Sequence, residues 1–383
     1  MNKPLEDVLV IDFSQFLSGP SASLRLADLG ARVVKIEQPD TGDICRSLYV
    51  SNIVLNGEST IFQAINRNKE SYQADLKDTE EQKKIYQLIK KADVVIHNFR
   101  PGVAERLGID YKTISKLNPE IIYGDITGYG KTGVWKDKPG QDLLLQAISG
   151  LTGLSGNDGA GPVPMGLAIV DMLAGIHLTQ GILAGLFKKA RHKKGTLIEV
   201  SMLESIIEFQ FESITTYYRD GGEPIQRTKT NNAHAYLGAP YGIYETKDGF
   251  IALAMGQIPV LGELLSCSEL LNYTEIKSWY NQRDEIKEIL SSHLKTKITE
   301  YWLSILEPAD IWCSAVLNWR ELFDSEGFKV LNMICEVVMT DGFKLKTTRC
   351  PIQINDQYLE SDLGAPKLGE HTKKITTEFL LNG

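Results

Sequence analysis

The sequence of 383 residues predicts an α/β fold with a smaller α+β region in the middle of the chain. Residues 8–13 (VLVIDF) and 31–37 (ARVVKIE) are short β-branched apolar runs, which are typical of strands. Residues 21–29 between them have helical character, and Gly30 is suited to end that helix. Strand, helix and strand within about 30 residues form a βαβ unit, whose strands pair in parallel.

The same alternation continues as far as residue 220. We expect further strands at residues 71–76, 93–96, 121–126 and 196–202, and helices at 78–92, 103–107, 110–117, 141–150 and 203–219. In the helix at 78–92 the acidic residues come first and the lysines last, which matches the helix dipole. The strand at 93–96 runs into HNFRPG, and loops that follow strands hold the ligands of open α/β sheets.

The composition shifts at 220–222 (DGG), where we expect a domain boundary. Beyond it, residues 241–253 predict a hairpin around KDG at 247–249, and residues 257–271 and 281–294 predict helices. These elements make up the smaller α+β region. Residues 343–354 are strand-like again.

The most unusual residue is Asp171, in a long apolar stretch at 164–190 that predicts one buried helix. From residue 159 to residue 187 there is no Lys, Arg or Glu, and Asp171 is the only Asp. An ionised carboxylate in apolar surroundings is costly unless it is hydrogen-bonded or paired. Asp171 is therefore either a satisfied structural carboxylate, such as a helix cap, or the working group of a site.

Composition excludes several classes of protein. The formal net charge of −8 argues against nucleic acid as a partner, because phosphate contacts need clustered Lys and Arg. The five cysteines are scattered and form no CxxC or His/Cys cluster, so we expect neither a disulfide framework nor a zinc site, and a cytoplasmic location suits them best. Residues 164–187 are long enough to span a bilayer, but their polar side chains favour a core helix and no membrane.

Standard catalytic motifs do not fit the chain. The turn at 14–20 (SQFLSGP) lacks the GxGxxG glycines of a dinucleotide fold. TGYGKTG at 127–133 lacks the P-loop register, and we interpret it as a mobile loop or lid. There is no GxSxG or HExxH, and His177 lies on a different helix face from Asp171. Pattern alone therefore indicates an α/β enzyme with one unusual aspartate.

Several longer segments carry a family resemblance. They are PLEDVLVIDFSQFLSGPSASLRLADLGARVVKIEQPDTGD near the start, ADVVIHNFRPGVAERLG at 92–108, LNPEIIYGDITGYGKTG at 117–133 and APKLGEHT near the end. In this order they resemble the family III CoA-transferases (the CaiB/BaiF family) over nearly the whole chain. The resemblance implies exchange of CoA between an acyl-CoA and a free carboxylic acid, with no metal and no cofactor beyond CoA itself.

The catalytic aspartate of that family matches Asp171, in VDMLAGIH. The resemblance implies that its carboxylate attacks the donor thioester, forms a mixed anhydride and then an aspartyl-CoA thioester, and passes CoA to the acceptor. The alternative within the family is a 2-methylacyl-CoA racemase or epimerase. Such members carry titratable groups where this chain has Gln141 and Gln257, which cannot titrate, so we favour the transferase.

The resemblance also implies a set of CoA contacts: Phe16, Leu17, Ser18, Gln38, Ala74, Asn98, Phe99, Arg100, Arg106, Lys138, Gln141 and Met202. Gly256 and Gln257 stand where some members have a glycine loop, and we expect them at a substrate lid. Arg106 suits a CoA phosphate or, alternatively, a salt bridge with Glu105 or another helix neighbour. Formyl-CoA transferase-like members have Gln in place of Leu17 and Arg in place of Gln38. Leu17 therefore indicates a more apolar acid pocket.

The architecture that the resemblance implies is an interlocked homodimer. Each protomer has a Rossmann-like large domain built from both chain ends, here residues 1–220 and 329–383, and a smaller α+β domain at 221–328. The expected partners are an acyl-CoA, a carboxylic acid and a second copy of the chain.

Overall fold

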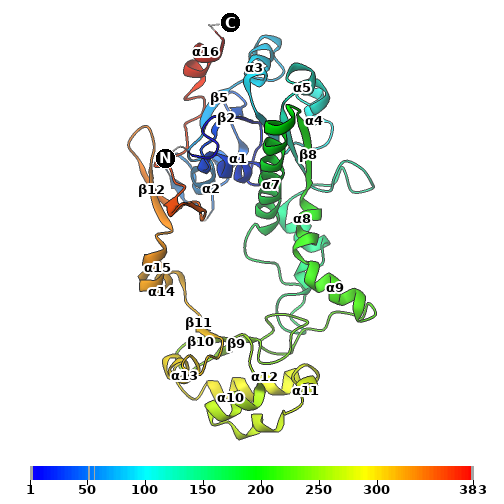
Figure 1. The fold of residues 1–383 in the computed structure, drawn as a ribbon, viewed down its shortest axis with the longest axis vertical. Coiled ribbons are helices and arrows are strands. Elements are labelled where there is room, and N and C mark those ends of the chain that lie inside the picture. Colours follow the sequence, from blue (N-terminus) through cyan, green and yellow to red (C-terminus); the bar gives the residue numbers. More distant parts are fainter. Residues whose placement is uncertain (1–2, 51, 56, 381–383) are drawn as a thin grey trace. The chain divides into compact units, whose positions relative to one another are not determined.

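The computed structural model describes residues 3–50, 52–55 and 57–380. Their contacts divide the chain into two units. The first unit comprises Met1–Leu145, Ala168–Glu208 and Leu331–Gly383, and the second comprises Gln146–Leu167 and Phe209–Val330 (Figure 1). The first unit therefore takes in sequence from both ends of the chain.

The first unit is built on a six-stranded sheet whose strands all run parallel. The order is β5 (Glu70–Gln73), β2 (Arg32–Glu37), β1 (Leu9–Asp12), β6 (Val94–His97), β7 (Ile122–Thr127) and β8 (Thr196–Ser201). The predicted α/β class with parallel strands is confirmed. The strand order changes direction between β1 and β6, and open sheets of this kind bind ligands beyond the carboxyl ends of the strands at such a point.

Helices cover both faces of this sheet. Helix α1 (Ser18–Asp28) packs against α7 (Ile169–His192), and α7 lies along β7 and β8. On the other face, α3 (Thr79–Lys91), α5 (Tyr111–Leu117) and α16 (Thr372–Leu380) share a core with apolar side chains of the strands. The unit also contains α2 (Thr60–Ile65), α4 (Val103–Arg106), most of α8 (Met202–Phe209) and a hairpin of β12 (Ile334–Val338) and β13 (Lys344–Thr348).

The second unit contains a three-stranded antiparallel sheet in the order β11 (Cys313–Ala315), β10 (Phe250–Leu253), β9 (Gly242–Glu245). The hairpin predicted at 241–253 is confirmed by the pairing of β9 with β10. Helices α10 (Ile258–Leu265), α12 (Arg283–Leu294) and α13 (Thr299–Leu306) bury one apolar core against this sheet. Its other helices include α9 (Phe211–Arg219), α11 (Ile276–Asn281), α14 (Trp319–Asp324) and α15 (Glu326–Leu331).

Three predicted helices have different limits in the structure. The helix expected at 164–190 begins at Ile169 and ends at His192. The helix expected at 203–219 is two helices, α8 and α9, separated at Gln210. The helix expected at 257–271 ends at Leu265, because Ser266 adopts the left-handed backbone conformation (φ 56°) that terminates helices. The strand expected at 343–354 ends at Thr348, shortly before Pro351.

The sequence predicted one buried helix here, but helix α7 is buried along one face only. Its buried face packs on the sheet, whereas Met172, Ile176 and Phe187 are 38%, 48% and 61% exposed. Among the described residues, α7 alone has the length and mean hydropathy (1.5) that would let a helix cross a membrane. Core helices pass the same test.

Candidate active site

Asp171 lies in the first turn of α7 and is half-buried. The backbone N–H and the hydroxyl of Ser18, at the start of α1, are the hydrogen-bond donors that lower the pKa of this carboxyl. Burial, followed by the charge of Asp142, raises the pKa of Asp171 to about 6, and the two bonds from Ser18 oppose that shift. The helix cap is Ala168, so Asp171 is not a capping residue, and its perturbed pKa marks it as a candidate functional group.

The cap of α7 comes from a distant part of the sequence. Ala168 has no side chain that could accept the first N–H groups of the helix. The Oδ2 atom of Asp142 accepts them instead, from the N–H of Val170 at 2.7 Å and from that of Asp171 at 3.0 Å. Asp142 is the first residue of α6 (Asp142–Ile148) and is buried. Sequence reasoning named its neighbour Gln141 but missed Asp142, because nothing in the local pattern reveals a cap supplied by another helix.

A glycine allows α1 and α7 to approach closely enough for Ser18 to reach Asp171. A Cβ atom on Gly175 would lie 2.0 Å from the Oγ atom of Ser21 and 2.8 Å from the carbonyl oxygen of Ser18. Ser21 also donates its hydroxyl to the Ser18 carbonyl at 2.7 Å. Any side chain at position 175 would therefore push the start of α1 away from α7.

The loop between β1 and α1 is hydrogen-bonded to the segment that follows β6. Asn98, which follows β6, binds both backbone groups of Gln15: its Oδ1 accepts the Gln15 N–H at 2.9 Å, and its Nδ2 donates to the Gln15 carbonyl at 2.7 Å. The same Nδ2 lies 3.3 Å from the Oγ atom of Ser18. The structure therefore brings Phe16, Leu17, Ser18 and Asn98 together with Asp171 at the point where the strand order changes direction.

The rest of the HNFRPG segment presents an aromatic ring and two arginines. Phe99 stacks on the buried ring of His97, with 5.5 Å between ring centroids. Arg100 and Arg106 are exposed. Within the described part of the chain neither guanidinium forms an ion pair, so the alternative salt bridge between Arg106 and Glu105 is not formed there. Both cations lie on the surface, where an anion can reach them.

The other residues in the predicted set are spread over the molecule. Ala74 and Met202 are buried in the packed interior, whereas Gln38, Lys138 and Gln141 are exposed. Gly256 and Gln257 belong to the second unit, where they line a hollow of about 520 Å³ together with Tyr236, Met255 and Trp279. Gln257 is the residue before α10 and is exposed. The role of each of these residues in binding CoA stays a prediction.

Two further features bear on the chemistry of the site. Over residues 3–50, 52–55 and 57–380, no group of three or more His, Cys, Asp or Glu side chains is arranged to hold a metal ion. The five cysteines are all free thiols.

Comparison with known proteins gives consistent results over the whole chain. Residues 5–372 match the model of CoA-transferase family III. The chain is 31% identical to succinyl-CoA:glutarate CoA-transferase of Mus musculus, over 99% of this chain and 87% of that protein. It is 30% identical to acetyl-CoA:oxalate CoA-transferase of Acetobacter aceti, over 98% of this chain and 96% of that protein. A crystal structure of a CAIB/BAIF family protein from Brucella suis superposes with a TM-score of 0.85 at 28% identity, covering 99% of this chain and all of that one.

Proposed function

Since this chain belongs to CoA-transferase family III, we propose that it moves CoA from an acyl-CoA to a free carboxylic acid through covalent intermediates on Asp171. The observation that carries this proposal is the half-buried Asp171 carboxylate in the first turn of α7, where α1 packs closely against that helix and burial raises the pKa of Asp171 to about 6. At neutral pH such a group is mostly ionised, yet it is more basic than an ordinary aspartate. Both properties suit a carboxylate nucleophile.

The proposed reaction conserves the thioester in balanced steps. The Asp171 carboxylate attacks the thioester carbon of the donor, the C–S bond breaks, and CoA leaves as a thiolate. The thiolate attacks the aspartyl carbonyl of the resulting mixed anhydride and expels the donor acid, which leaves an aspartyl-CoA thioester. The acceptor carboxylate attacks this thioester, and the thiolate released then attacks the acceptor carbonyl and regenerates Asp171. No step of the transfer needs water. Partial burial of Asp171 can therefore exclude water and protect the intermediates from hydrolysis without slowing the reaction.

The substrate class is proposed from the relatives and from two parts of the site. Several relatives are named for short dicarboxylic acids, namely glutarate, oxalate and mesaconate. We propose a short dicarboxylate acceptor larger than oxalate, since Leu17 places an apolar side chain beside Ser18. The exposed Arg100 and Arg106 are proposed to bind phosphates of CoA.

We also propose that the protein is a homodimer and lies in the cytoplasm. The exposed apolar face of α7 supports a homodimer, because large exposed apolar surfaces mark interaction sites. We propose the interlocked arrangement that the family resemblance implies. The free cysteines suit a reducing cytoplasm.

The decisive experiment is to trap the intermediate. The enzyme is incubated with succinyl-CoA or acetyl-CoA, treated with hydroxylamine or borohydride, and digested for mass spectrometry. We expect a modified peptide at Asp171, no modification in Asp171→Ala, and loss of turnover in that variant. Full turnover by Asp171→Ala would refute the mechanism. Deuterium exchange at the α-carbon of a 2-methylacyl-CoA, without any acceptor acid, would point to the racemase instead.

A further inference from the structure

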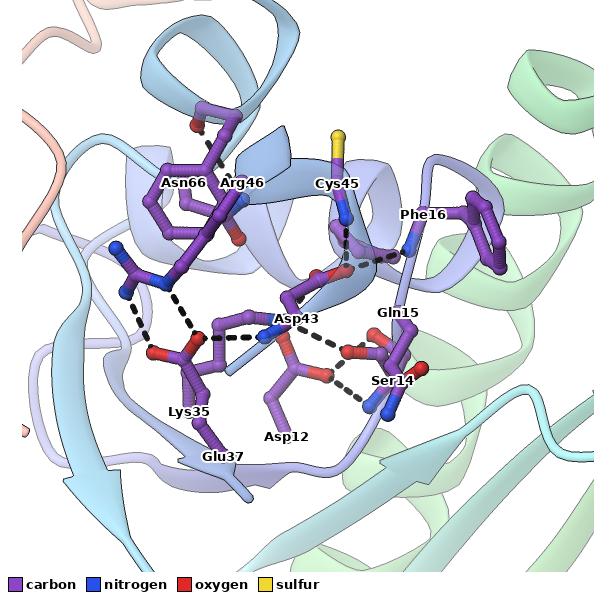
Figure 2. Close-up of polar contacts among 12 residues, drawn as sticks. Asp12, Ser14, Gln15, Phe16, Lys35, Glu37, Asp43, Cys45, Arg46 and Asn66 are labelled. Atoms are coloured by element: carbon purple, nitrogen blue, oxygen red, sulfur yellow. Dashed lines mark hydrogen bonds and ion pairs between the residues drawn. The ribbon is translucent and has the colours of Figure 1, made fainter. Parts of the chain in front are cut away.

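A buried polar cluster lies next to the loop that carries Phe16 and Ser18. Figure 2 shows its members, which include Asp12, Lys35 and Asp43. These three side chains are fully or almost fully buried. Buried charges are expensive and are seldom kept without a partner or a task.

Asp43 connects this cluster to the loop. Its Oδ1 atom accepts the N–H of Phe16 at 3.1 Å and the N–H of Cys45 at 2.9 Å. Its Oδ2 atom pairs with the Nζ atom of Lys35 at 2.8 Å, and neither side chain of this pair is exposed. Lys35 in turn donates to the carbonyl oxygen of Ser14 at 2.6 Å (Figure 2). The pair therefore holds the loop at two backbone positions.

The charges around the pair keep it ionised. Burial opposes the charge of Lys35, but Asp43, Asp12 and Glu37 raise its pKa above the usual value. Asp12 also accepts hydrogen bonds from the N–H and the hydroxyl of Ser14 and lies 3.4 Å from the Nζ atom of Lys69. The cluster is thus a connected network, and each member depends on its partners.

The loop needs such support because its backbone is strained at one residue. Phe16 has φ 61°, in the left-handed region that a residue with a side chain rarely adopts. Phe16 is also 46% exposed, so packing of its ring does little to hold that conformation. Such strain persists only where the surroundings impose it, and it is common at functional sites. The hydrogen bond from the Phe16 N–H to Asp43 is part of what imposes it.

The segment after Phe16 leads directly to the reacting group. Ser18, two residues later, lies against α7, where a Cβ atom on Gly175 would be 2.8 Å from the Ser18 carbonyl oxygen, and its N–H and hydroxyl lower the pKa of Asp171. We propose that Asp43, held by Lys35, is a positioning residue for the transfer reaction: it fixes the left-handed turn at Phe16 and thereby aligns Ser18 with Asp171. This inference rests on the proposed function of Asp171. Asp43 itself touches no reacting atom.

The test compares two substitutions at Asp43. Asp43→Ala removes the acceptor for Phe16, whereas Asp43→Asn keeps an oxygen acceptor and removes only the charge. We expect kcat to fall on the order of a hundredfold in the Ala variant and about tenfold in the Asn variant, with KM for acyl-CoA little changed. The pH midpoint of the acylation rate should rise by roughly one unit in the Ala variant, because the Ser18 bonds that lower the Asp171 pKa are loosened.

A second buried ion pair in the same unit provides the control. Arg67 contacts Asp28 at 2.6 Å, both side chains are buried, and Asp28 lies at the far end of α1 from Ser18. Asp28→Asn should therefore lower the melting temperature as Asp43→Asn does, but leave kcat and the pH midpoint unchanged. If Asp43→Asn and Asp28→Asn have the same melting temperature, kcat and pH midpoint, Asp43 contributes only to stability and the inference fails.

Two more measurements separate the possible failures. If Asp171→Ala is inactive while both Asp43 variants keep wild-type kcat and pH midpoint, only the role of Asp43 is overturned. If Asp171→Ala keeps full turnover, the proposed function itself is wrong. Should the Asp43 variants not fold, hydrogen exchange of the wild-type enzyme decides the matter. The Phe16 amide should exchange as slowly as amides of β1, and exchange as fast as in the loop at 130–133 would overturn the inference.

Discussion

At Asp171 opposing effects set the state of one carboxylate. Burial and the nearby charge of Asp142 favour the protonated form, and the hydrogen bonds from Ser18 favour the ionised form. The result, a pKa of about 6, means that this carboxylate is mostly ionised at neutral pH and yet more basic than an ordinary aspartate. This arrangement has a cost in stability, which can be measured.

Asp171→Asn should stabilise the protein at pH 7.5. The folded-state pKa of about 6 lies above the usual value of 3.8, so the folded protein binds this proton more tightly than the unfolded chain. The stability that Asp171 contributes is complete below about pH 3.8 and is lost as the pH rises through about 6. At pH 7.5 we expect the free energy of unfolding of the variant to exceed that of the wild type by on the order of 1 kcal/mol, after allowing for the partial exposure of Asp171.

Thermal unfolding at pH 7.5 and at pH 4 checks this prediction. The advantage of Asp171→Asn should be present at the higher pH and absent at the lower one. An equal gain at both values would show that the Asp171 proton is not linked to folding.

Leu17 is the residue whose exchange should change acceptor choice. Leu17→Gln places a hydrogen-bonding amide where the apolar side chain stands, and a polar group that pairs with the substrate can discriminate strongly. We expect the ratio of kcat/KM for oxalate to that for glutarate to rise by about tenfold. Competition between the two acids for one acyl-CoA donor measures the ratio, and an unchanged ratio would remove Leu17 from the acid pocket.

At the scale of elements, the crossing of α1 and α7 decides whether a site exists. The nucleophile comes from one helix and its hydrogen-bond donors from the other, so the distance between the helix axes sets the geometry. Small residues at the crossing permit this distance, and Gly175 has the least room for a side chain. The buried Asp142 caps α7 at the same end and fixes where the first turn begins.

Gly175→Ala should therefore damage activity as well as stability. The added Cβ would meet Ser21 and the backbone of Ser18, and overpacking of this kind costs about 1–3 kcal/mol. We expect a lower melting temperature and a fall in kcat on the order of tenfold. Gly327→Ala, in α15, is a matched control because nothing lies within 4 Å of its added Cβ. Equal effects of the two substitutions would contradict the proposed importance of the crossing.

At the scale of the whole molecule, the exposed apolar face of α7 is the feature that one chain does not explain. Met172, Ile176 and Phe187 lie about one helical turn or a multiple of it apart, on the face turned away from the sheet. A homodimer would bury this face. We propose that a second copy of the chain covers it.

We expect a mass in solution of twice the 42.7 kDa of one chain. Ile176→Glu should shift the protein toward a single chain, because a charge in an apolar interface is left without a partner. Light scattering measures the mass, and Lys84→Glu, on the exposed face of α3, serves as the charge control. A wild-type mass equal to that of one chain would contradict the proposed homodimer.

Local sequence was sufficient for much of the fold. The β-branched apolar runs around Val10 and Val33 predicted two strands that are buried on both faces of a sheet. The helix between the two runs predicted a crossover connection, and a crossover makes neighbouring strands parallel, as β1 and β2 are. It was less reliable for helix limits. The apolar composition continues through residues 164–168, but α7 starts only at Ile169, where Asp142 supplies the cap.

The sequence by itself determined the α/β class, the family resemblance and the identity of one conspicuous aspartate. Only the tertiary structure decided what surrounds that aspartate. Asp142 and Asp43 are ordinary polar residues in the sequence, and they become important because packing brings distant segments within hydrogen-bond distance. The pKa of a carboxylate depends on burial and on neighbouring charges, and both are properties of the folded chain.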